Sequence, residues 1–283
     1  MCLIAFAIQP TPDLALLLAG NRDEALDRPT LPLHPWTTPN GTPVMGGRDQ
    51  RDGGTWLATT GPGAKHHRVA MLTNVRHGRD TTRWPRSRGE LPLLWLDGMA
   101  LAELTQHMDP AAYGAFNLVV GDLATGQWHW LTNRDARHQT VLHTQALPPG
   151  VYGLSNAALN TPWPKTVALR QALATAVADW ECPDRFGQPH ALDATEPLWQ
   201  VLADPHVWPD DQLPQTQVPL EWERALSAIW VNHPSGYGTR TSAVLSVART
   251  TQGMPEFQWR FQEQTWRPEA QKGLQEEEWV TDR

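Results

Sequence analysis

The sequence predicts an α+β fold that contains mainly antiparallel β-sheet. Short apolar runs occur in pairs separated by turn residues, and stretches of helical length lie between these pairs. Hairpins interspersed with a few helices are typical of an α+β domain. At 283 residues the chain is long enough for a substantial core. We expect one domain over residues 1–283, with a charged tail that frays at 270–283.

Four hairpins account for the expected sheet. The predicted strand pairs are 2–8 with 14–19, 55–60 with 69–73, 116–121 with 127–132, and 244–247 with 257–261. Proline and aspartate separate the first pair, and Gly61-Pro62-Gly63 supplies the turn of the second. Within 127–132 successive side chains alternate in character, as in a strand that exposes two different faces.

Helices are expected between the hairpins, at 89–97, 101–108, 163–180 and 195–202. The third is the clearest, because it is rich in alanine and leucine, Thr161 can cap its N-terminus, and Pro162 suits a first helical position. Prolines and acidic residues accumulate from 179 to 219, which predicts a loop-rich excursion rather than a linker between domains.

Composition and charge exclude several classes of function. The chain has 23 basic and 30 acidic residues and a net charge of −7, which argues against nucleic acid as the main partner. No apolar run approaches the roughly 20 residues that span a bilayer, and a signal-peptide pattern is missing. Cys2 and Cys182 lie far apart and make no disulfide framework, so a reducing, cytoplasmic compartment is expected. Metal-binding and phosphate-binding motifs are absent, and we expect no metal and no cofactor.

The cysteine at position 2 is the first candidate for chemistry. Cysteine is small enough there for aminopeptidases to remove Met1, and Cys2 would then carry both a thiol and a free α-amine. An α-amine has a pKa of about 7.7–8.0, so it can act as the base for the thiol, as in N-terminal nucleophiles. The alternative is that Cys2 is a small apolar residue at the start of a buried strand.

The polar run Asn21-Arg22-Asp23-Glu24 directly follows the second apolar run. If the first two strands form a hairpin, the end of the second lies beside the start of the first, and this run lies next to Cys2. A carboxylate there can hold the α-ammonium group, and Arg22 favours the thiolate. The alternative is a solvated turn with an ion pair that contributes at most about 1 kcal/mol.

Three later residues are also candidates for a site. Asn74 and Asn156 lie in apolar surroundings, and a preorganised amide NH2 group is a suitable donor to an oxyanion. Asparagine also terminates strands and turns, so a structural role is the alternative. Arg240 follows two glycines and enters a predicted strand, and an arginine at the edge of a core needs an anionic partner.

Seven sequence blocks together resemble the NRDE family, which is named in animals for transport and Golgi organisation 2. The blocks are MC at the N-terminus, NRDE at 21–24, GGTWLA at 53–58, LTNVR, FNLVVGD, YGLSNAALNTPWPK and GYGTRTSAV. They occur in order from residue 1 to about 247 and cover most of the chain. The family looks like a branch of the N-terminal nucleophile hydrolases, similar to penicillin V acylases and bile-salt hydrolases. The resemblance implies a four-layer αββα sandwich of two stacked antiparallel sheets.

The resemblance also implies that Cys2 is the nucleophile and that its amine is the base. The other residues that it implies are Arg22, Asp23, Asn74, Asn156 and Arg240 as catalytic groups, with Asn21 and Arg76 as substrate-binding groups. In this comparison Asp23 holds the amine and Arg240 lies near the thiol. The chain departs from the acylases in one respect: they place an arginine three residues before the aspartate, where this chain has Gly20.

Two functions remain open from the sequence. The first is hydrolysis of an amide or thioester bond of a small acylated substrate. The second is non-catalytic carriage of an amphipathic anionic ligand such as haem, a lipid or an acyl-CoA. Five arginines favour the second, because they would form a rim that attracts carboxylate or phosphate groups, although a solvated loop is the alternative. These are Arg76, Arg79, Arg83, Arg86 and Arg88.

Overall fold

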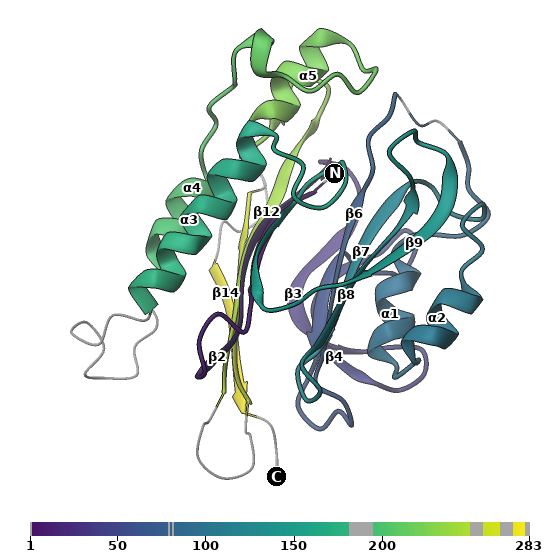
Figure 1. Cartoon of the computed structure of the whole chain (residues 1–283), viewed down its shortest axis with the longest axis vertical. Coiled ribbons are helices and arrows are strands. Elements are labelled where there is room, and N and C mark those ends of the chain that lie inside the picture. Colours follow the sequence, from purple (N-terminus) through teal and green to yellow (C-terminus); the bar gives the residue numbers. More distant parts are fainter. Residues whose placement is uncertain are drawn as a thin grey trace.

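The computed structural model describes residues 2–78, 80, 82–180, 195–249, 257–266 and 274–280. In these residues the chain forms two antiparallel sheets of seven strands each, together with helices α1 to α5 (Figure 1). The predicted α+β class is therefore confirmed. Within the described ranges no helix is both long and apolar enough to cross a membrane.

Sheet 1 contains both the first strand of the chain and the last described one. In spatial order it consists of β10 (Gly150–Leu154), β1 (Cys2–Ile8), β2 (Leu14–Ala25), β12 (Tyr237–Arg249), β13 (Phe257–Thr265) and β14 (Leu274–Val280), with β11 (Asn232–His233) paired to β12. Sheet 2 follows chain order: β3 (Thr30–Thr37), β4 (Pro43–Asp49), β5 (Leu57–Thr60), β6 (Arg68–Asn74), β7 (Phe116–Asp122), β8 (Gln127–Arg134) and β9 (Thr140–Ala146).

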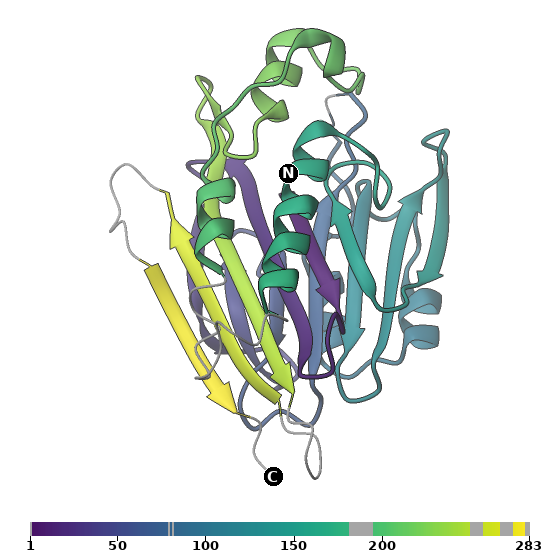
Figure 2. The same cartoon turned by 60° about the vertical axis from the view of Figure 1, so that its left-hand side comes forward.

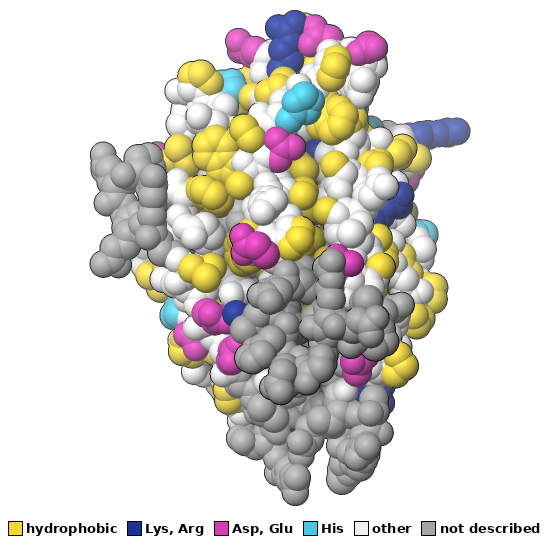
Figure 3. All heavy atoms as spheres, turned by 90° about the vertical axis from the view of Figure 1, so that its left-hand side faces the viewer, with side chains coloured by type: hydrophobic (Ala, Val, Ile, Leu, Met, Phe, Trp, Pro, Cys, Tyr) yellow, Lys and Arg dark blue, Asp and Glu magenta, His cyan; other side chains and the backbone are white. Residues whose placement is uncertain are grey.

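Helices α3 and α4 lie on the outer face of sheet 1 and α1 and α2 on that of sheet 2, whereas α5 lies at one end of sheet 1 (Figures 1 and 2). Their bounds are α1 (Glu90–Leu96), α2 (Leu101–His107), α3 (Pro164–Trp180), α4 (Glu196–Leu202) and α5 (Leu220–Ser227). Helix α3 packs on β1, β2 and β10, whereas α1 packs on β5, β6 and β7. On the face that bears α3 and α4, apolar side chains are scattered and charged ones are sparse (Figure 3).

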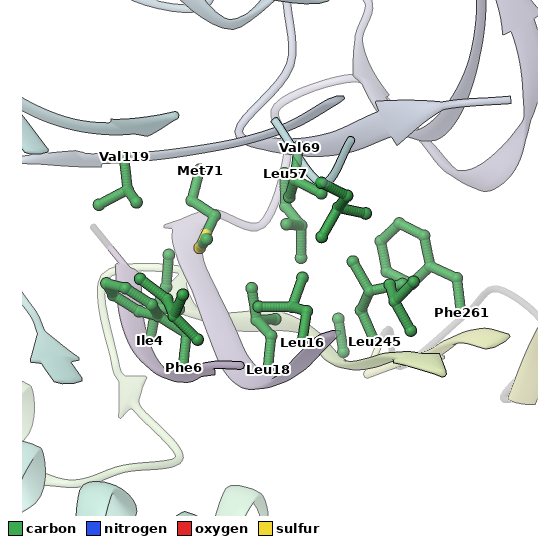
Figure 4. Packing of buried hydrophobic residues seen from close by; sticks show 14 of the residues in the cluster. Ile4, Phe6, Leu16, Leu18, Leu57, Val69, Met71, Val119, Leu245 and Phe261 are labelled. Atoms are coloured by element: carbon green, nitrogen blue, oxygen red, sulfur yellow. The ribbon is translucent and has the colours of Figure 1, made fainter. Parts of the chain in front are cut away.

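An apolar core fills the space between the facing sheets (Figure 4). Ile4 and Phe6 of β1 meet Met71 of β6 and Val119 of β7 in this core. The other face of β1 is also buried, because Leu3 and its alternate neighbours pack against α3. This double burial explains why the first strand is a continuous apolar run rather than an alternating one. Since side chains alternate along a strand, Cys2 lies on the same side as Ile4, toward sheet 2.

The four predicted hairpins are confirmed, with β1 paired to β2, β5 to β6, β7 to β8 and β12 to β13. The polar run after Ala19 is not a solvated turn, because β2 continues through it to Ala25 and buries Asn21, Arg22 and Asp23. The run remains a strand because β1 and β12 pair with it on both sides and satisfy its backbone.

Two element boundaries also differ from the prediction. Helix α3 begins at Pro164, so Thr161 is not its N-cap and Pro162 lies before the helix. Proline at the first helical position costs no intrahelical hydrogen bond, which explains the later start. Residues 274–280 form strand β14 on the edge of sheet 1 rather than a frayed tail.

Several elements escape prediction from the sequence. Strand β3 contains Pro32 and Pro35, which disfavour a strand unless it lies at a sheet edge, and β3 does lie at the edge of sheet 2. Strand β9 is the other edge of that sheet and is mostly exposed, so it lacks an apolar pattern. Cys182 lies outside the described residues.

Glu263 connects the two sheets. It lies on β13, is 1% exposed, and accepts a hydrogen bond of 2.9 Å from the backbone N–H of Leu33 in β3. Burial raises the pKa of Glu263 to about 7, although the Leu33 N–H, Arg22 and Thr241 oppose the rise. The folded protein therefore holds a proton that the unfolded chain releases near pH 4.3, and the free energy of unfolding should fall as the pH rises through this window.

We expect Glu263→Gln to melt at a higher temperature than the wild type at pH 8, because the variant buries no charge there. The difference in melting temperature between the variant and the wild type should shrink toward pH 5, where Glu263 is protonated in the folded state. Thermal unfolding at both pH values measures it, with the exposed Glu221→Gln as the matched control. A difference that is the same at pH 5 and pH 8 would contradict the role of the Glu263 proton.

Candidate functional site

A cavity of about 1380 Å³ lies at the end of the two sheets where β1 begins and β6 ends. Cys2, Arg22 and Asp23 line it from sheet 1, and Asn74 and Arg76 line it from the end of β6. The cavity therefore gathers five of the eight residues that the sequence assigns to a site.

The pairing of β1 with β2 places the thiol. Cys2 lies directly opposite Arg22, as the predicted hairpin requires. Directly opposite residues share one face of a sheet, so the thiol and the guanidinium both face the space between the sheets. Asp23 is the next residue along β2, so its side chain faces α3, beside the end where β1 begins.

Cys2 is buried, with 7% of the residue exposed. Burial raises its pKa, and the nearby carboxylates of Asp23 and Glu24 add to the rise. The positive charges of the chain's amino terminus and of Arg22 oppose it. Because the net shift is upward, the thiol keeps its proton at neutral pH unless a neighbouring base accepts it.

Asp23 is almost completely buried, at 1% exposure. Its Oδ1 atom accepts a hydrogen bond of 2.7 Å from the hydroxyl of Thr239, and its backbone carbonyl accepts one of 2.8 Å from the hydroxyl of Tyr237. Burial raises the pKa of Asp23, while the positive charges of Lys165 and the amino terminus and the bond from Thr239 oppose the rise. The carboxyl group is thus buried and held in place by the hydroxyl of Thr239.

Arg22 is fixed by sheet 2. Its guanidinium carbon lies 4.2 Å from the centroid of the Trp56 ring, and its Nη2 lies 3.3 Å from Oδ2 of Asp49. The arginine of the acylases has no space at the position that this chain gives to Gly20. A Cβ atom there would lie 2.8 Å from the backbone oxygen of Leu3, which is too close for a side chain.

Asn74 and Asn156 lie together. The Nδ2 of Asn156 donates to Oδ1 of Asn74 at 3.1 Å and to its backbone oxygen at 2.9 Å. The neighbouring Ser155 donates from its hydroxyl to the backbone oxygen of Cys2 at 3.3 Å. Asn156 is fully buried, whereas Asn74 lines the cavity. Since the oxygen of Asn74 is held, its NH2 group is the free donor, and it has no acceptor among the described residues.

Asn21 and Arg240 are buried but do not line the cavity. Asn21 donates to the backbone oxygens of Leu202 and Ile229, each at 2.8 Å, and so joins β2 to the segments beside it. Arg240 donates to the backbone oxygens of Ala25 and Arg28, and so holds the turn after β2. Both residues have a structural role in this arrangement.

The arginine stretch forms part of the cavity wall, although Arg83 within it is exposed to solvent. Arg76, Arg83, Arg86 and Arg88 all line the cavity, whereas Arg79 lies outside the described residues. Arg76 is 4% exposed and forms an ion pair of 3.0 Å with Glu223 of α5. Arg86 pairs with Glu90 at 2.5 Å.

Arg88 differs from Arg76 and Arg86 because it forms no ion pair with a carboxylate in the described part of the chain. It donates to the backbone oxygen of Ala115 at 3.0 Å. Burial lowers its pKa, which the charges of Asp80, Glu24 and Cys2 oppose. A guanidinium held in this way can accept an anionic group from a ligand.

Lys165 and Glu223 are the charged residues that sequence reasoning missed. Lys165 lies in the first turn of α3 and is 2% exposed, and Glu223 lies in α5 and is 5% exposed. Charged residues in short helices are usually solvated, so neither stands out in the sequence. The block YGLSNAALNTPWPK, which ends at Lys165, was the only signal.

This chain is similar to known proteins over most of its length. The family model described as Transport and Golgi organisation 2 matches residues 1–267. The human Transport and Golgi organization protein 2 homolog is 33% identical over 262 residues, which cover 87% of this chain and 88% of the human protein. The Drosophila melanogaster Transport and Golgi organization protein 2 is 28% identical over 269 residues, with the same coverage of both chains. The chain belongs to the transport and Golgi organisation 2 family.

Proposed function

We propose that the protein is an N-terminal nucleophile hydrolase that cleaves an amide or thioester bond of a small acylated, anionic substrate. Cys2, freed by removal of Met1, is the nucleophile. The observation that carries the proposal is the pairing of Cys2 with Arg22, which puts the thiol in the cavity and the amino end of β1 beside the buried Asp23. The two facing sheets with helices outside them are consistent with an αββα hydrolase.

The proposed reaction begins when the α-amine of Cys2 accepts the thiol proton. The thiolate attacks the substrate carbonyl carbon, and the NH2 group of Asn74 donates a hydrogen bond to the oxyanion that forms. The intermediate collapses, the bond to the leaving amine or thiol breaks, and the α-ammonium group returns its proton to that leaving group. The product is an acyl-enzyme thioester.

Water completes the cycle. The α-amine takes a proton from a water molecule, whose oxygen attacks the thioester carbonyl carbon. The carbon–sulfur bond then breaks, the carboxylic acid leaves, and the thiol regains its proton from the α-ammonium group. Because burial raises the pKa of the Cys2 thiol, this base and the charge of Arg22 are both needed for attack at neutral pH.

The cavity supports an anionic substrate with an apolar part. Arg88 and Arg134 both lie in its wall and have no carboxylate partner among the described residues, since each donates only to a backbone oxygen. Trp84 lies beside Arg134, with 5.9 Å between the guanidinium carbon and the ring centroid. Trp56 and Leu72 supply apolar wall.

A second function rests on the same cavity. The high pKa of the buried Cys2 thiol also favours a non-catalytic carrier of an amphipathic anion such as haem, a lipid or an acyl-CoA, because a carrier needs the arginines but no thiolate. In that case ligand binding is independent of the thiol.

The first test of the proposed hydrolase asks whether acyl transfer requires both the removal of Met1 and the thiol of Cys2. Protein released by a protease so that it starts at Cys2 should form an acyl-enzyme with an acyl-CoA, seen as a mass increase of one acyl group. The uncleaved fusion and Cys2→Ala should form none, and Cys182→Ala is the matched control and should retain it. A Cys2→Ala protein that still turns over the substrate would rule out the nucleophile, and one that only binds acyl-CoA would favour the carrier.

Asn74→Ala should reduce kcat by about 10²–10³-fold, because one oxyanion donor contributes about 2.7–4 kcal/mol to the barrier. KM should change little, since the bond forms mainly in the transition state. Steady-state kinetics measure both, with the exposed Asn232→Ala as the control. A change in KM alone would assign Asn74 to substrate binding instead.

Arg88→Met should weaken binding of an acyl-CoA by about tenfold or more, because a hydrogen bond to a charged group contributes about 1.5–3 kcal/mol. Isothermal titration in the Cys2→Ala background separates this binding from turnover. The exposed Arg137→Met controls for the loss of one positive charge. Equal weakening by both variants would show a general charge effect and not a site at Arg88.

A further inference from the structure

One side of the cavity is apolar and has no role in the proposed bond cleavage. It is formed by Val218, Trp222 and Leu226, which all line the cavity and which we call the α5 wall. Trp222 and Leu226 lie four residues apart on α5, so they share one face of the helix, and Val218 precedes them by the same interval. Val218 and Trp222 are half-buried, and Leu226 is buried. The face of α5 toward the cavity is therefore apolar.

The α5 wall is separate from the apolar core. None of its three residues belongs to the apolar clusters that the described residues form between the sheets and beneath the helices. Helix α5 lies at one end of sheet 1, where it contacts the short strand β11 (Figure 2). Apolar side chains that line a cavity, and that the core does not use, are suited to an apolar part of a ligand.

Glu223 holds the α5 wall in place. Its Oε2 atom accepts a hydrogen bond of 3.0 Å from Nη2 of Arg76, and its Oε1 atom accepts bonds of 2.7 and 2.6 Å from the backbone N–H and the hydroxyl of Thr216. The backbone oxygen of Thr216 accepts a further bond of 2.6 Å from the N–H of Gly78. Because Glu223 directly follows Trp222, these bonds fix the wall to the chain after β6. A preorganised wall lowers the entropic cost of binding.

The unpaired cations of the cavity are carried by other elements. Arg88 precedes α1 and Arg134 ends β8, and both elements belong to the sheet 2 side of the molecule. Arg76, which contacts α5, is paired with Glu223. The cavity therefore has an apolar side on α5 and a cationic side on sheet 2, which together complement an amphipathic anion.

Trp56 and Leu72 also line the cavity, but they offer a ligand little surface. Each is 8% exposed, and each belongs to an apolar cluster of the core. The guanidinium group of Arg22 also lies over the Trp56 ring. The α5 wall is thus the better site for an apolar chain.

We propose that the α5 wall is the subsite for the acyl chain of the substrate and that Trp222 sets the preference for chain length. This inference rests on the proposed function and narrows its substrate class to an acyl group of several carbons joined to an anionic leaving group. The chain lies along Val218 and Trp222, and the leaving group faces Arg88 and Arg134. The acyl carbonyl carbon lies between the two sides, at Cys2.

The test measures binding of coenzyme A, butanoyl-CoA and octanoyl-CoA by isothermal titration in the Cys2→Ala background. Octanoyl-CoA should bind about tenfold or more tightly than butanoyl-CoA, because it has four more methylenes and each fully buried methylene contributes about fourfold. Trp222→Ala and Val218→Asp should each reduce this ratio to about twofold or less and leave the affinity for coenzyme A unchanged. Arg88→Met should weaken binding of all three and preserve the ratio.

Two matched controls lie in the segment that leads to α5 but do not line the cavity. Trp208 is half-buried and Val207 is 47% exposed, so Trp208→Ala and Val207→Asp should leave the ratio as it is. Trp222 stacks on His233 at 3.9 Å, and Val218→Asp provides the test if loss of that contact prevents Trp222→Ala from folding.

A chain-length ratio that is the same with and without Trp222 and Val218 would overturn the inference. Equal weakening of coenzyme A and octanoyl-CoA, or no binding of any of the three, would do the same. If the ratio behaves as expected but protein that starts at Cys2 forms no acyl-enzyme, the hydrolase proposal fails and the subsite stands. If the acyl-enzyme forms equally fast from both chain lengths, with or without Trp222, the subsite fails and the hydrolase stands.

Discussion

The antiparallel pairing of β1 with β2 brings the start of the chain against a run of buried charges. Cys2 lies opposite Arg22, and the carboxylate of Asp23 lies one residue further along β2. Both faces of β1 are packed, one against sheet 2 and the other against α3, so neither register nor direction can change without exposing apolar side chains. Hydrophobic burial therefore fixes the position of the polar groups.

Buried charges are concentrated at this end of the molecule. Asp23 and Lys165 are both buried, and so is the ion pair of Arg76 with Glu223, which joins the end of β6 to α5. Buried charges are tolerated where opposite charges and hydrogen bonds compensate them. Removal of one residue of such a pair leaves the other as an uncompensated buried charge. The segment that carries α5 is thus tied to the site by electrostatics, although it is distant from Cys2 in sequence.

The sequence was sufficient to predict the hairpins and the residues next to Cys2, because paired apolar runs and short turns are local signals. The hairpin geometry alone placed the run that contains Arg22 and Asp23 next to Cys2, and the pairing of Cys2 with Arg22 confirms this. Lys165 and Glu223 could not be found in that way, because their burial depends on contacts between distant elements. For the same reason the sequence did not predict the structural role of Asn21 and Arg240, whose side chains donate hydrogen bonds to backbone oxygens away from the cavity.

The close contact at Gly20 has a consequence for the shape of any ligand. The main chains of β1 and β2 approach so closely there that not even a methyl group fits beside Leu3 and Ile4. Below the pair of Cys2 and Arg22 the space between the sheets is filled by apolar core. Cys2 therefore lies at the bottom of the cavity, and the acyl chain of the proposed acyl-enzyme must run outward along the wall instead of threading between the sheets. Selectivity for chain length would then be set by the cavity rim and not by the core.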